Sequence, residues 1–288
     1  MIQPDEGYVE ANGIRLHTLL WRSGQASLPP LLLLHATGFL ARLWQPVAEL
    51  LSPRFDVYAF DTRGHGDSDK PPPEGKNYHW RNLVEDLGGF CDTLGFRGVS
   101  MAGHSSGGAA VAYLATERPE YISKLVLFEP IILPPQFVPP SDRRSELAEG
   151  ARKRRAVWPN TQELVEAYRT RPVFERWRDD VLRLYAEHGA FRREDGQIEL
   201  KCSGEIEAQV FEHSGSLDTW DRLPEIRSPA LVMHGELTGE QFLALMSQIA
   251  QRIPRGRLAS VPGAGHLAPM ERPEAVAQSV LEFIEEPE

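Results

Sequence analysis

Short apolar runs recur along the first part of the chain, and longer stretches with helical periodicity separate them. Residues 14–21, 31–34, 57–60, 99–102 and 124–128 are predicted strands, and residues 42–51, 78–94 and 106–116 are predicted helices. The run from Leu31 to Leu34 is apolar at every position rather than at alternate ones. A strand of this kind is buried on both faces, as in a parallel sheet that helices cover on both sides.

The alternation of strands and helices breaks at Pro130, where a proline-rich passage begins. From about residue 134 to 215 the chain is rich in arginine, glutamate and aromatic residues and has no apolar strand of the parallel type. Strands at 230–233 and 257–261 and helices at 241–253 and 273–285 then restore the pattern. The sequence therefore predicts an α/β core formed by residues 1–133 and 216–288, with a helical lid inserted at 134–215.

Composition narrows the classes of function. The 288 residues suffice for a sizeable core, and a net charge of −10 disfavours binding to nucleic acid or to an anionic membrane surface. The two cysteines, Cys91 and Cys202, belong to no metal-binding motif, so neither a zinc site nor a disulfide framework is expected. Without a secretory signal or an apolar run of about 20 residues, the expected location is the cytoplasm. The oligomeric state has no signature in the sequence.

Gly103, Ser105 and Gly107 form a G-x-S-x-G motif between a predicted strand and a predicted helix. A serine on such a tight turn needs glycine two positions to either side, because a larger side chain would collide with the strand or the helix. The free N–H groups and the positive dipole end of the helix then face the oxyanion of a substrate. The motif alone also fits an inert turn, but its position between strand and helix favours Ser105 as a nucleophile.

Four motifs in sequence order make the chain resemble the α/β-hydrolase superfamily over nearly its whole length. The serine motif is one, and the others are His35-Ala36-Thr37-Gly38-Phe39, Asp61-Thr62-Arg63-Gly64-His65-Gly66-Asp67-Ser68 and Pro262-Gly263-Ala264-Gly265-His266. The segment from His35 to Phe39 resembles the oxyanion loop of the family, with Ala36 where glycine is usual. The resemblance implies the α/β-hydrolase fold, with a mostly parallel eight-stranded sheet, helices on both faces and an inserted helical lid, and it implies neither a cofactor nor a metal.

The resemblance also implies the roles of individual residues. His266 is expected to be the general base, and the backbone N–H groups of Thr37 and Ser106 are expected to form the oxyanion hole. The acid of the family usually follows the seventh strand, but here that segment reads Gly235-Glu236-Leu237-Thr238 and lacks an aspartate.

Thr238 cannot stabilise an imidazolium, so the acid must come from elsewhere. A carboxylate at the end of the sixth strand serves in some members of the superfamily, and Glu129 lies there. The alternatives are Glu236, then Asp218, Glu240 or no acid at all, with a salt bridge between Glu129 and the lid as the purely structural role. On this assignment Glu129→Gln is expected to impair catalysis severely, whereas Glu236→Gln and Thr238→Ala are expected to do little.

The candidate substrate-binding residues are Phe39, Trp44, His104, Phe137 and Trp158. Further aromatic residues of the lid could wall an acyl pocket, although aromatic side chains at helical spacing more often belong to a core. These are Tyr168, Phe174, Trp177, Tyr185 and Phe191. The basic run Arg152-Lys153-Arg154-Arg155 could bind an acidic group, but a solvated helix face is the simpler interpretation.

We therefore expect a cofactor-free serine hydrolase that cleaves a small carboxylic ester or a lactone through an acyl-enzyme intermediate. A serine nucleophile disfavours dehalogenases and epoxide hydrolases of the same fold, which use an aspartate. Two alternatives stay open. One is a carbon–carbon bond hydrolase or a perhydrolase with the same triad, and the other is a small-molecule receptor without turnover.

Overall fold

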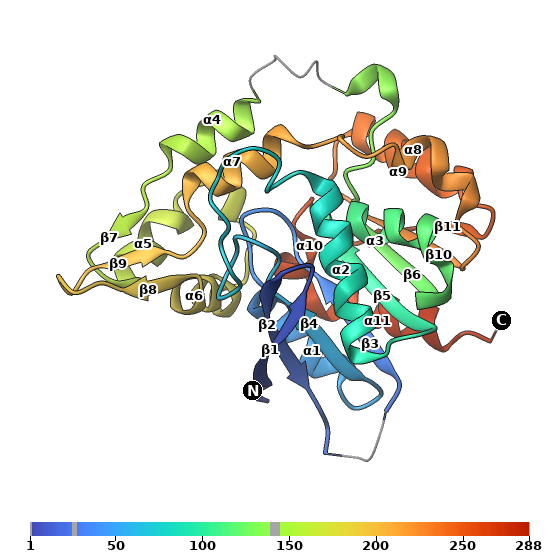
Figure 1. Ribbon diagram of the computed structural model, residues 1–288, viewed down its shortest axis with the longest axis horizontal. Helices are drawn as coiled ribbons and strands as arrows, with labels where there is room; N and C mark the ends of the chain where they lie inside the picture. The colour runs from blue at the N-terminus through green and yellow to red at the C-terminus, as the bar shows by residue number, and fades with distance from the viewer. Residues whose placement is uncertain (1, 25–27, 139–144, 288) are drawn as a thin grey trace.

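An eight-stranded sheet with the strand order β1-β2-β4-β3-β5-β6-β10-β11 runs through the computed structural model (Figure 1). The structure describes residues 2–24, 28–138 and 145–287, so residues 139–144 of the expected lid lie outside the described part. Strand β2 is antiparallel to both β1 and β4, and the other neighbouring pairs are parallel. The prediction of a mostly parallel eight-stranded sheet is confirmed.

The predicted strands of the core are present, with ends that differ by up to two residues. The sheet consists of β1 (Asp5–Ala11), β2 (Ile14–Trp21), β3 (Pro30–Leu34), β4 (Asp56–Phe60), β5 (Val99–His104), β6 (Ile122–Phe128), β10 (Ala230–Gly235) and β11 (Gly256–Val261). Strand β1 was not predicted, because it is an edge strand whose residues are mostly exposed and lack an apolar alternation.

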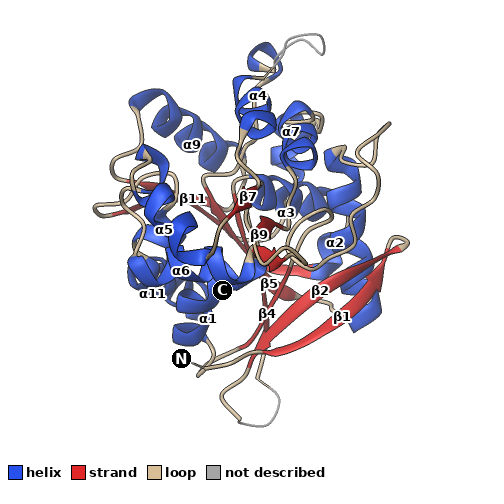
Figure 2. Cartoon of the chain, turned by 90° about the vertical axis from the view of Figure 1, so that its left-hand side faces the viewer, coloured by secondary structure: helices blue, strands red, loops and turns tan. Residues whose placement is uncertain are grey.

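Helices cover both faces of the sheet (Figure 2). Side chains of α2, α3 and α9 pack on one face, and side chains of α1 and α11 pack on the other. Leu32 and Leu34 of β3 belong to the first cluster, Leu31 and Leu33 to the second, which explains why this strand is apolar throughout. The helices are α1 (Gln45–Leu51), α2 (Trp80–Leu94), α3 (Ser106–Glu117), α8 (Thr219–Arg222), α9 (Glu240–Arg252), α10 (Ala268–Glu271) and α11 (Pro273–Glu285).

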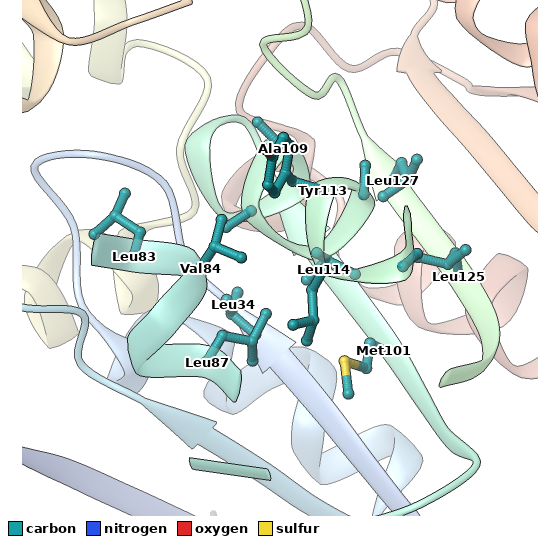
Figure 3. Packing of buried hydrophobic residues seen from close by; sticks show 14 of the residues in the cluster. Leu34, Leu83, Val84, Leu87, Met101, Ala109, Tyr113, Leu114, Leu125 and Leu127 are labelled. Atoms are coloured by element: carbon teal, nitrogen blue, oxygen red, sulfur yellow. The ribbon is translucent and has the colours of Figure 1, made fainter. Parts of the chain in front are cut away.

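The first cluster joins two helices to the middle of the sheet (Figure 3). Leu83, Val84 and Leu87 come from α2, and they pack with Leu114 of α3 and with Met101 of β5. Burying such side chains contributes about 1.5–3 kcal/mol each. This packing fixes α3, and with it the turn that carries Ser105, against the ends of the central strands.

Residues 146–212, which we call the cap segment, lie between β6 and α8 in the chain and to one side of the sheet (Figure 1). The predicted lid is helical, but the structure also contains a three-stranded antiparallel sheet in the order β7-β9-β8. Strands of two or three residues are too short to show a hydrophobic period in the sequence. The elements are α4 (Glu146–Lys153), β7 (Val157–Trp158), α5 (Thr161–Arg169), α6 (Asp179–His188), β8 (Ala190–Arg192), β9 (Ile198–Leu200) and α7 (Gly204–Glu212).

None of the helices described is both long and apolar enough to span a bilayer.

Candidate active site

The parallel strands bring three distant side chains to one edge of the sheet. Ser105 follows β5, Glu129 follows β6, and His266 lies in the loop after β11. Because β5, β6, β10 and β11 are parallel, their carboxyl ends lie at the same edge. The Nδ1 atom of His266 lies 2.6 Å from Oε2 of Glu129, and Ser105 and His266 line the same cavity.

The turn at Ser105 has the steric constraints that the sequence predicts. A Cβ atom on Gly103 would lie 2.6 Å from the backbone of Gly107, and one on Gly107 would lie 2.6 Å from the carbonyl oxygen of His35. Ser105 itself has φ of 54°, a conformation that costs a residue other than glycine about 1–3 kcal/mol. The surrounding packing holds the serine at the edge of the cavity despite this cost.

Glu129 is fully buried, also has a positive φ of 37°, and accepts hydrogen bonds on both carboxylate oxygens. Its Oε1 accepts the N–H of Gly235 at 2.8 Å and the hydroxyl of Thr238, and its Oε2 lies against His266. Burial acts to raise the pKa of Glu129, but the hydrogen bonds from His266 and Thr238 outweigh it and lower that pKa. These partners belong to β10 and to the loops after β10 and β11, rather than to the cap segment.

The other candidate acids lie elsewhere. Glu236 is exposed, and its Oε2 accepts the N–H of Gly263 at 2.8 Å, so it stabilises the turn before the histidine. Asp218 and Glu240 are exposed as well. Within the described part of the chain, Glu129 is the one carboxylate bonded to the imidazole of His266.

Thr238 has a contact that the sequence did not indicate. It stands where the family usually has an aspartate, and its hydroxyl donates to Oε1 of Glu129. The expectation that Thr238→Ala does little therefore changes. We expect Thr238→Val to lower kcat about 10- to 100-fold, because a hydrogen bond to a charged group is worth about 1.5–3 kcal/mol. Steady-state kinetics checks this, with Thr238→Ser as the variant that keeps the donor, and equal rates for the two variants would contradict it.

Two groups hold the histidine loop in place. The ring of buried His104 lies 5.0 Å from that of His266, and its Nε2 is 2.8 Å from the carbonyl oxygen of His266. Burial lowers the pKa of His104 well below its ordinary value, so the ring is neutral and donates from Nε2. Glu271, which the sequence analysis missed, accepts the N–H of Gly265 at 2.7 Å. His104 thus supports the loop and does not line the cavity, contrary to its prediction as a substrate-binding residue.

Since Nδ1 of His266 is bonded to Glu129, Nε2 is the nitrogen left to accept a proton from Ser105. Among the described residues, the hydroxyl of Ser105 makes no hydrogen bond to this ring. Catalytic hydrogen bonds are often long in the free enzyme and tighten when substrate binds.

The two predicted oxyanion donors lie side by side. The N–H of Thr37 donates to Oγ of Ser106 at 2.9 Å, and both residues line the cavity. Ser106 is the first residue of α3, where an N–H has no acceptor within the helix. The loop that carries Thr37 is fixed by Gly38, whose N–H donates to Nε2 of His65 at 3.0 Å.

The bond from Gly38 requires His65 to stay neutral, and this makes the fold sensitive to acid. Burial and the neighbouring His35 lower the pKa of His65 to about 3, whereas in the unfolded chain it is near 6.5. The unfolded state therefore binds more protons as the pH falls below 6.5, and the stability that neutral His65 contributes is lost between pH 6.5 and about 3.

We expect His65→Gln to flatten the loss of stability between pH 7 and 5, because glutamine does not titrate. The slope of the unfolding free energy against pH is expected to fall by up to about 1.4 kcal/mol per pH unit. Denaturant unfolding at several pH values measures it, and the same substitution at half-buried His213 serves as the control. Parallel pH profiles for the wild type and His65→Gln would refute this assignment.

A cavity of about 1300 Å³ contains the site. Phe39 lines it, and so do Tyr168, Phe174 and Tyr185 of the cap segment. Three predictions of lining residues are wrong, since the side chains point elsewhere. Trp44 packs in the core cluster of α1 and α11, Trp158 packs within the cap segment, and Phe137 is 67% exposed outside the wall.

The basic run of the cap segment divides into two parts. Arg152 forms ion pairs with Glu205 and Glu212, and the side chain of Lys153 is 80% exposed, so the interpretation as a solvated face holds for these two. Arg154 is different, because only 13% of its side chain is exposed and it pairs with Glu207 at 2.7 Å. Lys153, Arg154 and Arg155 all line the cavity, and Arg154 is the one of the three whose side chain is buried in an ion pair.

One group of side chains in the described part of the chain has the spacing of metal ligands. The ligand atoms of His17, Asp61 and Asp67 lie within 4.8 Å of one another. However, the carboxylate of Asp61 already accepts hydrogen bonds from Nδ1 of His17 at 2.9 Å and from the N–H groups of Ala41 and Asp67. Burial acts to raise the pKa of Asp61, but these hydrogen bonds and the nearby histidines lower it to about 2. None of the three residues lines the cavity, and their contacts account for them as a structural cluster.

Comparisons with known proteins agree with this fold. A sequence profile of the alpha/beta hydrolase family matches residues 31–279. The chain is 26% identical to a 2-(acetamidomethylene)succinate hydrolase of Mesorhizobium japonicum, over 91% of this chain and 90% of the relative. It is 27% identical to a carboxylesterase of Bacillus subtilis, over 98% and 88% of the two chains. The crystal structure of an enol-lactonase from Burkholderia xenovorans superposes with a TM-score of 0.76 and 25% identity, over 97% of this chain and all of that one.

Proposed function

The chain belongs to the alpha/beta hydrolase family, and we propose that it is a cofactor-free serine hydrolase that cleaves a small carboxylic ester or a lactone. That it is a hydrolase follows from the family and from the named hydrolase and esterase relatives. The bond that it cleaves and the residues that cleave it are our proposal. The relatives include a carboxylesterase and an enol-lactonase, which supports esters and lactones as the substrate class.

In the proposed mechanism Ser105 Oγ attacks the carbonyl carbon while Nε2 of His266 takes its proton. The N–H groups of Thr37 and Ser106 stabilise the oxyanion, a contribution of about 3–4 kcal/mol for each such donor. The intermediate collapses, the imidazolium returns its proton to the leaving alcohol oxygen, and an acyl-serine remains. A water molecule, deprotonated by the same nitrogen, then attacks the acyl group, and Ser105 is released with a carboxylic acid.

The observation that carries the proposal is the hydrogen bond between buried Glu129 and His266, beside the cavity of Ser105. A carboxylate on Nδ1 fixes the imidazole tautomer that leaves Nε2 as the proton acceptor, and it stabilises the imidazolium. We further propose that the insertion at 134–215 acts as the cap of the site, since the cap segment supplies much of the cavity wall.

A panel of 4-nitrophenyl esters of increasing chain length, several lactones and an aryl diketone tests the proposal. We expect measurable turnover of at least one ester or lactone by the wild type and the loss of nearly all of it in Ser105→Ala. Cleavage of the diketone alone would replace the proposal by carbon–carbon bond hydrolysis. Binding of these compounds without any turnover would replace it by a receptor role.

A further inference from the structure

The cap segment gives the cavity a polar wall that the proposed mechanism does not use. We give the name cap recess to five of the residues that line the cavity here, which are Arg154, Tyr168, Arg171, Tyr185 and Glu207. Four other charged residues of the cap segment line the same cavity, namely Glu146, Lys153, Arg155 and Glu212. Both tyrosines are buried, and their rings stack with centroids 5.7 Å apart. The two stacked rings form the apolar base of this wall.

The hydroxyl of Tyr168 has an unused capacity for hydrogen bonding. Only 1% of this residue is exposed, and its oxygen has no hydrogen-bond partner in the described part of the chain. Buried polar atoms are nearly always paired, because an unpaired one loses its bonds to water without replacement. Tyr168 lines the cavity, so a small shift of its side chain would allow this donor to pair with a ligand that carries an acceptor.

The charges of the cap recess do not cancel. Arg154 lies 2.7 Å from Glu207, and its other contacts are the hydroxyl of Tyr185 at 3.3 Å and the carbonyl oxygen of Cys202 at 2.9 Å. Half-buried Arg171 lies over the ring of Tyr168, 4.8 Å from its centroid, and forms no ion pair with any described carboxylate. Within the cap recess, Arg154 and Glu207 offset each other, so Arg171 leaves one positive charge without a counterion. Of the other charged lining residues, Glu212 pairs with Arg152 and Lys153 with Glu149, while Arg155 forms no ion pair with a described carboxylate and adds to the positive charge of the wall. A guanidinium in such a position binds a carboxylate more strongly than it would in bulk water.

We propose that the cap recess binds a carboxylate of the substrate, through the guanidinium of Arg171 and the hydroxyl of Tyr168. The preferred substrates are then acyl compounds with a second, ionised carboxyl group, such as monoesters of dicarboxylic acids or lactones with a carboxylate substituent. This inference rests on the proposed function, since Ser105 and the cap recess share one cavity. Arg154, neutralised by Glu207, holds Tyr185 and thereby the aromatic stack.

A pair of esters of equal length separates charge recognition from general hydrophobic binding. The 4-nitrophenyl monoester of adipic acid carries a distal carboxylate, and 4-nitrophenyl hexanoate does not. For the wild type at low salt we expect kcat/KM for the adipate ester to exceed that for hexanoate about tenfold or more. Arg171→Met is expected to remove this preference, so that its kcat/KM values for the two esters agree within about twofold.

Two further variants serve as controls. Arg169→Met removes a neighbouring arginine that is paired with Asp179 outside the cavity, and it is expected to keep the preference for adipate. Tyr168→Phe keeps the stacked ring and deletes only the hydroxyl, so we expect the ratio of the adipate value to the hexanoate value to fall by about 3- to 10-fold. The proposal would be overturned if Arg171→Met and Arg169→Met had the same preference for the adipate ester over the hexanoate ester. It would also be overturned if the wild type preferred hexanoate.

Calorimetric binding of adipate and of neutral adipamide to Ser105→Ala distinguishes this inference from the proposed function. The cap recess is supported if adipate binds more tightly than adipamide and if this binding is lost in Ser105→Ala/Arg171→Met. This result would hold even if no ester is turned over. Turnover of hexanoate without any preference for adipate in binding or kinetics would leave the hydrolase proposal intact and reject the cap recess.

Discussion

Ser105→Ala is expected to lower kcat for the best ester substrate by about 10⁶-fold. The rate that remains is the residual rate that substrate binding and the oxyanion hole sustain without a nucleophile. The reason is that the variant has no atom that can form the acyl-enzyme, so only direct attack by water remains. The parent rate, the rate of the variant and the uncatalysed rate are measured with one 4-nitrophenyl ester. A residual rate within a hundredfold of the wild type would mean that Ser105 is not the nucleophile.

Two comparisons make the result interpretable. Ser106→Ala removes the neighbouring hydroxyl but keeps the backbone N–H that we propose as an oxyanion donor, so we expect a much smaller loss than for Ser105→Ala. Combining Ser105→Ala with His266→Ala is expected to add little, because residues of one catalytic unit act together.

Glu129→Gln is expected to lower kcat by about 10⁴-fold with little change in KM. Glutamine keeps the size of the side chain but presents a neutral amide to Nδ1 of His266, which can no longer stabilise the imidazolium or enforce the correct tautomer. The loss is a property of the transition state, so it appears in kcat rather than in substrate binding.

Glu236→Gln is the matched control for this substitution. Glu236 lies in the segment where the family usually has its acid, but it bonds the backbone of Gly263 instead of the imidazole. We expect kcat to stay within about threefold of the wild type, in line with the usual small effect of an exposed polar substitution. The opposite ranking of Glu129→Gln and Glu236→Gln would assign the acid to Glu236.

The sequence predicted those parts of the site that depend on backbone order. Ser105, Glu129 and His266 each follow a strand of a parallel sheet, and this topology alone brings strand ends together. Glu129 was predictable because a carboxylate at the end of a buried strand needs a strong donor. The supporting contact from Thr238 was not, since it depends on where two loops meet.

The cavity wall was harder to predict because it depends on the direction of each side chain. Trp44 lies near the oxyanion loop in sequence, but it turns into the sheet face under α1 and α11. The charge pattern predicts a solvated helix face that includes Arg154, but α4 ends at Lys153 and Arg154 has an extended backbone with ψ of 131°. The helical period therefore stops one residue before it, and the side chain turns inward.

Intact-mass measurement after treatment with a fluorophosphonate probe tests most directly whether Ser105, His266 and Glu129 form one nucleophilic unit. We predict one adduct per chain on Ser105 in the wild type, no adduct in Ser105→Ala, and labelling slowed by several orders of magnitude in His266→Ala and Glu129→Gln. A folded wild-type protein that stays unlabelled would contradict the account. Equal labelling rates in the wild type, His266→Ala and Glu129→Gln would contradict it as well.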